Sequence, residues 1–128
     1  MERMQSKVRV RFSFYGFDCD PEEITLAVGI EPSEITRIGE TRFKGNAWTV
    51  ESGMSEEVDL PTQVRSLLHR LESSWPSLVQ LGQRYDAVIT CVVESYGGDQ
   101  PAIYFEKDIV KRVAELNAHL DVDLYILP

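Results

Sequence analysis

The residues best suited to chemistry lie in one short segment near the N-terminus. Cys19 stands between Asp18 and Asp20, directly before a helix that the sequence predicts from Pro21. A thiol at a helix N-terminus can be activated by the helix dipole, and carboxylates grouped there could bind a cation. The same residues also have a structural explanation, because Asp20 suits the N-cap, Pro21 the first helical position and Glu23 the return contact of a capping box. Since the flanking carboxylates oppose formation of a thiolate, we expect Cys19 to behave as an ordinary thiol.

The two histidines, His69 and His119, are the only other candidates for acid-base chemistry. They fall on two different predicted helices, and no second histidine or cysteine stands at metal-ligand spacing from either. We therefore expect no metal and no cofactor. A small thiol-dependent or hydrolytic enzyme centred on Cys19 stays open as an alternative, provided that the fold brings one histidine to the sulfur.

A second feature is the uneven distribution of charge. Residues 1–44 hold seven Lys and Arg against eight Asp and Glu, whereas residues 45–128 hold six against thirteen. The net charge of -8 disfavours general nucleic-acid binding.

Acidic residues recur through the last third of the chain: Asp99, Glu106, Asp108, Glu115, Asp121 and Asp123. Such charge commonly does no more than keep a protein in solution. The sharper hypothesis is a docking surface for a basic protein, with Asp121 and Asp123 as binding residues, in the way that an immunity protein neutralises a nuclease toxin.

A small basic cluster offers a third candidate site. Arg37, Arg42 and Lys44 stand close to Phe43 and Trp48, and aromatic rings beside positive charge could contact an anion or RNA. The simpler interpretation is a surface loop followed by a strand that Trp48 anchors in the core.

Length and composition indicate one self-folding domain over residues 1–128. Hydrophobic residues make up 43% of the chain and charged residues 27%, as in ordinary globular proteins. No apolar stretch approaches the roughly 20 residues that span a bilayer, and the first residues lack the pattern of a secretory signal, so we expect neither membrane association nor secretion. With two cysteines and no Cys-x-x-Cys spacing, we expect free thiols and a cytoplasmic protein. A homodimer stays possible.

The patterns of apolar residues predict an alternation of strands and helices. Residues 8–15 alternate as a strand, and a short helix runs from 21 to about 28. The later elements are a strand over 47–51, a helix over 60–78 that Pro76 breaks, a strand over 85–95, a hairpin into 102–105, a helix over 109–120 and a strand over 122–127. This order predicts an α+β fold: a mixed, mostly antiparallel sheet with helices packed on one face. From residue 47 onward it matches a ferredoxin-like split β-α-β core, with an N-terminal β-α addition.

Several segments resemble one bacterial family, known only as domain of unknown function 4279. They are residues 17–25 (FDCDPEEIT), 29–33 (GIEPS), 38–40 (IGE), 48–52 (WTVES) and 120–125 (LDVDLY). The segments consist of caps, turns and core positions, so the resemblance implies membership and an α+β fold but transfers no catalytic residue. Asn117-Ala118-His119 departs locally from the small residue and glycine that the family tends to have there.

Overall fold

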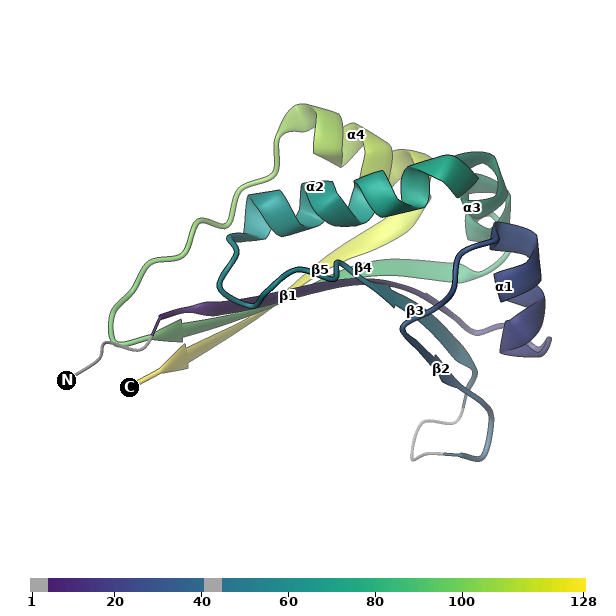
Figure 1. The fold of residues 1–128 in the computed structure, drawn as a ribbon, viewed down its shortest axis with the longest axis horizontal. Coiled ribbons are helices and arrows are strands. Elements are labelled where there is room, and N and C mark those ends of the chain that lie inside the picture. Colours follow the sequence, from purple (N-terminus) through teal and green to yellow (C-terminus); the bar gives the residue numbers. More distant parts are fainter. Residues whose placement is uncertain (1–4, 41–44) are drawn as a thin grey trace.

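A five-stranded sheet with the strand order β2-β3-β1-β4-β5 forms one layer of the fold, and the helices lie on one of its faces (Figure 1). The structure is a computed structural model that describes residues 5–40 and 45–128. Along the chain the elements are β1 (Lys7–Tyr15), α1 (Pro21–Val28), β2 (Glu34–Thr36), β3 (Ala47–Glu51), α2 (Leu60–Leu71), the 3₁₀ turn η1 (Glu72–Ser74), α3 (Trp75–Gly82), β4 (Asp86–Tyr96), α4 (Lys107–Glu115) and β5 (Ala118–Leu127).

Strand β1 lies in the middle of the sheet and shows why one face is covered. It pairs antiparallel with both β3 and β4, and its alternate residues Val8, Val10, Phe12 and Phe14 are buried on one face. The helices contribute side chains to the same core and lie on that side of the sheet, so none of the described helices covers the opposite face, which we call the open face (Figure 1). The predicted α+β class, the mixed and mostly antiparallel sheet and the helices on one face are confirmed.

The helix boundaries follow the capping signals in the sequence. The Asp20 carboxylate accepts a hydrogen bond of 2.9 Å from the backbone N–H of Glu22, and Gly29 ends α1 in the left-handed conformation at a φ of 76°. At Pro76 the predicted break is present, because η1 separates α2 from α3. The buried positions of α2 include Leu60, Val64, Leu67, Leu68 and Leu71, which recur every three or four residues and so lie on one side of the helix.

The predicted hairpin after β4 is wrong. Residues 99–106 form no strand, although Gly97 and Gly98 make a turn with positive φ values of 59° and 79°. The neighbour of β4 is instead β5, which pairs with it in parallel after the chain has passed through α4. Pro101 lacks the N–H that an antiparallel partner would donate, and this weakens the hairpin relative to the longer pairing with β5.

The last helix is shorter and the last strand longer than predicted. Helix α4 ends at Glu115, and Asn117 takes a positive φ of 54°, which turns the chain directly into β5. The periodicity predicts His119 in the last turn of a helix. In the structure it lies in β5. An asparagine tolerates this left-handed conformation better than most residues, so the turn has a local cause.

The split β-α-β unit is present, but a different strand fills it. Strands β3 and β4 both run antiparallel to β1, so they are parallel to each other, with α2 and α3 connecting them. The strand between them is β1, where the sequence had indicated residues 102–105. The N-terminal strand is thus the centre of the sheet and not an addition to it.

Among the described residues, no helix combines the length and the apolar character that crossing a membrane would need.

Candidate functional site

The segment Asp18-Cys19-Asp20 is explained mainly by the start of α1. Besides capping the helix, Asp20 accepts a hydrogen bond of 3.4 Å from the guanidinium of Arg37. The backbone N–H of Glu22 and then Arg37 lower the pKa of Asp20 below its usual value. Asp18 and Asp20 are exposed and Cys19 is half-buried. The two carboxylates therefore lie in solvent, and Asp20 is used by the helix start and by Arg37.

The side chain of Cys19 contacts a tyrosine. Its sulfur lies 3.9 Å from the hydroxyl oxygen of Tyr85, and desolvation, followed by this contact, raises the pKa of the Tyr85 phenol. In the described part of the chain, no hydrogen bond links Cys19 to His69 or His119. His69 is on the exposed side of α2, with Nδ1 at 3.3 Å from the Glu72 carboxylate. No three His, Cys, Asp or Glu residues within 5–40 and 45–128 are grouped to hold a metal ion.

Asn46 holds the loop around Cys19, and the sequence analysis missed it. The buried Asn46 amide donates to the backbone carbonyls of Phe17 and Cys19, at 2.9 and 3.1 Å, and its oxygen accepts from the N–H of Ile38 at 2.9 Å. All of these partners are main-chain groups, so the role of Asn46 is to fix two loops. The turn residue Gly45 before it was the only local signal.

The predicted basic cluster divides into parts with different roles. Arg37 pairs with Asp20 and Glu22, at 3.4 and 3.5 Å. Trp48 is fully buried, and its indole N–H donates to the Thr25 hydroxyl at 3.0 Å, so it is a core anchor and offers no stacking surface. Arg42, Phe43 and Lys44 lie outside the described residues.

Asp121 and Asp123 lie on β5, at one edge of the sheet. Their register partners on β4 are Thr90 and Val92, which places both carboxylates on the open face. Both residues are exposed. Within the described residues, neither side chain makes an ion pair or a hydrogen bond.

The other acidic residues of the last third are engaged elsewhere. Arg65 on α2 lies 3.0 Å from the carboxylate of Asp108 and 3.4 Å from that of Glu106, and the Arg65 hydrogen bond is the main reason why the pKa of Asp108 is lowered. Glu115 accepts a hydrogen bond of 3.2 Å from the indole N–H of Trp75. The structure therefore separates Asp121 and Asp123 from the rest of the acidic set.

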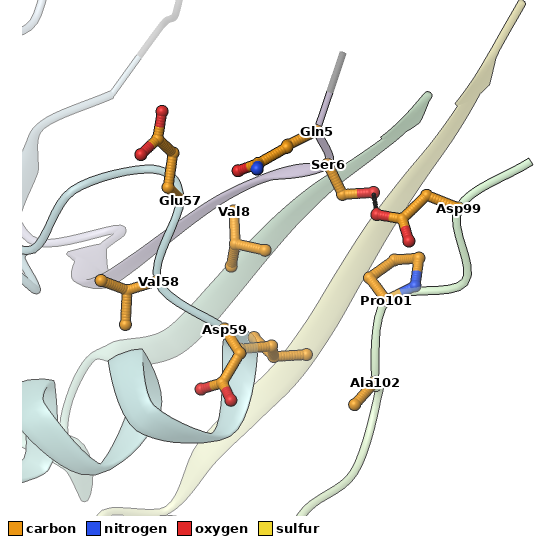
Figure 2. A pocket seen from close by; sticks show the side chains of 10 residues that line it. Gln5, Ser6, Val8, Glu57, Val58, Asp59, Asp99, Pro101 and Ala102 are labelled. Atoms are coloured by element: carbon orange, nitrogen blue, oxygen red, sulfur yellow. Dashed lines mark hydrogen bonds between the residues drawn. The ribbon is translucent and has the colours of Figure 1, made fainter. Parts of the chain in front are cut away.

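Two surface hollows among the described residues are further candidate sites. One, of about 410 Å³, lies where the loop of Glu57 and Val58 faces the loop of Pro101 and Ala102 (Figure 2). At its rim the Ser6 hydroxyl lies 2.5 Å from a carboxylate oxygen of Asp99.

The second hollow, of about 450 Å³, lies on the open face of the sheet. Its lining includes Arg11, Tyr15, Glu34 and Thr36. Its charged groups are the cation of Arg11 and the carboxylate of Glu34, and its described lining contains no group of catalytic residues. These residues do not indicate a particular class of ligand.

Together these features define an α+β domain with a sheet covered on one face and an acidic strand at its edge. The chain belongs to the family described as Domain of unknown function (DUF4279), whose model matches residues 6–127. Neither the curated proteins nor the solved structures contain a match to the chain.

Proposed function

We propose that this protein is a non-enzymatic interaction module that binds a basic protein through β5. The observation that carries the proposal is the state of Asp121 and Asp123: both are exposed, both face the same side of the sheet, and neither is neutralised within the described residues. Carboxylates that lack an internal partner can pair with cations of another molecule without first breaking a bond within the domain.

The arrangement of charge on the open face supports the same proposal. The arginines of β1, Arg9 and Arg11, are in register with Val92 and Thr90 of β4, which in turn lie beside Asp123 and Asp121. Two strand spacings, roughly 10 Å, therefore separate the cations from the acidic edge. A basic partner that approaches the edge of the sheet at β5 would meet the carboxylates before it met these arginines.

The overall charge adds long-range attraction to this local pattern. At a net charge of -8, mostly from residues 45–128, the domain attracts a cationic protein during diffusion and speeds the encounter. We further propose that the module acts in the cytoplasm, since Cys19 and Cys91 are both free thiols.

The test is a pull-down with the tagged domain, followed by kinetics with each purified partner. The proposal predicts a basic partner whose association rate falls by about tenfold or more from low to physiological salt. The double substitution Asp121→Asn with Asp123→Asn should slow association while leaving the circular dichroism spectrum and the melting temperature unchanged.

A matched control variant is Glu23→Gln with Glu31→Gln. It removes the same charge from exposed residues around α1. Association that is equally fast at low and high salt, or equal rates for the two double variants, would refute docking through β5.

A further inference from the structure

Among the described residues, the edge of the sheet at β5 is long and pairs with no further strand. Strand β5 extends over ten residues, Ala118–Leu127, and its strand partner is β4 on one side alone. In an edge strand every second residue directs its backbone N–H and C=O groups away from the sheet. No side chain of β5 is fully buried, and Leu124, Tyr125 and Ile126 are 48%, 52% and 79% exposed.

The opposite edge of the sheet is protected by its shortness. Strand β2 has only three residues, Glu34–Thr36. Proteins commonly protect long edges with lysine, proline or a bulge. Strand β5 contains neither lysine nor proline, and it stays in continuous register with β4 from Ala118 to Leu127. Its only charged residues are Asp121 and Asp123.

The two aspartates disfavour a second copy of this chain in the register that brings them opposite each other. An antiparallel copy centred on Val122 would place Asp121 of each chain opposite Asp123 of the other. Like charges directly opposite each other on neighbouring strands are destabilising. A strand with cations at those positions would replace this repulsion with attraction.

From this we infer that β5 binds an extended segment of the partner as a sixth strand, and that this segment alternates Lys or Arg with apolar residues. The inference rests on the proposed function and specifies its geometry. Added to the edge, such a segment places its cations beside Asp121 and Asp123 on the open face. Its apolar residues then lie on the helix side, beside Val122, Leu124 and Ile126.

The experiment uses the full chain and a labelled peptide of alternating valine and arginine, with binding followed by fluorescence anisotropy. A second peptide has the same composition but contiguous arginines. Two further peptides carry N-methyl groups on the odd or on the even residues, which removes the backbone donors on one side of the strand. Strand addition requires that one N-methylated peptide binds about tenfold or more weakly than the parent, while the other binds within about twofold.

The variants separate this inference from the proposed function. The parent peptide should bind the double variant Asp121→Asn with Asp123→Asn at least about threefold more weakly than it binds the original chain. It should bind the control variant Glu23→Gln with Glu31→Gln as tightly as the original chain. If both N-methylated peptides and the contiguous peptide bind as well as the parent, strand addition is refuted while electrostatic docking survives. If one methylation pattern abolishes binding but the aspartate variant binds normally, the edge accepts a strand and the selection of a basic partner is refuted.

Two remaining outcomes also overturn the inference. The first is a lack of binding by the parent peptide at millimolar concentration. The second is a dimer of the chain, detected by sedimentation, that persists in the presence of the N-methylated peptides but dissociates in the variant Ile126→Lys. In that case a second copy of the chain would occupy the edge.

Discussion

The side-chain amide of Gln63 in α2 donates a hydrogen bond of 2.7 Å to the backbone carbonyl of Val8 in β1. Gln63 is fully buried, and its amide nitrogen also lies 3.2 and 3.0 Å from the carbonyl oxygens of Ser55 and Val58. Its oxygen accepts from the Ser52 hydroxyl at 3.0 Å. One side chain thus joins the first turn of α2, the loop before it and the central strand.

Replacing Gln63 by leucine should destabilise the fold by about 2–4 kcal/mol, because several buried polar groups would lose their partner at once. Urea unfolding followed by circular dichroism measures the loss. Gln80→Leu on the exposed side of α3 is the control and should change stability by less than about 0.5 kcal/mol. Equal effects of the two substitutions would mean that the Gln63 network is not structural.

A close contact between α3 and the end of α4 gives a second prediction. A Cβ added to Gly82 would lie 2.2 Å from the backbone carbonyl oxygen of Leu116, so Gly82→Ala must push the two segments apart. We expect a cost of at least about 1–3 kcal/mol. Gly45→Ala is the matched control, because its Cβ would meet no atom within 4 Å. Equal melting temperatures for the two variants would contradict this contact.

The local signals in the sequence were sufficient for most of the elements. Asp20 caps α1 as its type and position predict, and the break that Pro76 predicts is present between α2 and α3. These features depend on neighbours within one or two turns of the chain. They could therefore be inferred from spacing alone.

The features that sequence reasoning missed depend on distant parts of the chain. Either residues 102–105 or β5 could pair with the edge of β4. The structure pairs β4 with β5, more than twenty residues further along the chain, and periodicity does not predict which strands pair. Asn46 and Gln63 are polar residues whose partners are mostly backbone groups of other segments, so the pattern of apolar residues does not mark them. For the candidate site, the sequence shows that Asp121 and Asp123 are acidic. The topology is needed to show that they lie on an edge strand, where neither has a partner among the described residues.

Leu68→Ala should cost about 2–5 kcal/mol, as truncations of fully buried leucines do. Its side chain belongs to the core that α2 shares with β1 and β4. Chemical denaturation measures the change, and the exposed Leu26→Ala in α1 is the control. A loss below about 0.5 kcal/mol at Leu68 would place this residue outside the core.

The two cysteines should differ in accessibility. Cys19 is half-buried beside Tyr85, whereas Cys91 is fully buried in β4. In the folded protein, iodoacetamide should modify Cys19 and spare Cys91, and modification of Cys91 should begin only when urea unfolds the chain. Mass spectrometry of tryptic peptides distinguishes the two sites. Equal modification of both cysteines in native buffer would show that β4 opens readily.

The buried thiol of Cys91 also predicts how stability changes in alkali. Burial, followed by the nearby carboxylates of Asp121 and Asp123, raises the pKa of Cys91 from its usual 9.0 to about 12. Because the folded state holds this proton more tightly than the unfolded state, its contribution to stability is complete below pH 9.0 and is lost as the pH rises toward 12. The free energy of unfolding should fall by about 2 kcal/mol between pH 9 and pH 10.5, since each pH unit costs roughly 1.4 kcal/mol in this range. Urea unfolding across that range should therefore give a steeper fall for the original chain than for Cys91→Ala. Parallel curves for the original chain and Cys91→Ala would show that the Cys91 thiol does not stay protonated in the folded state.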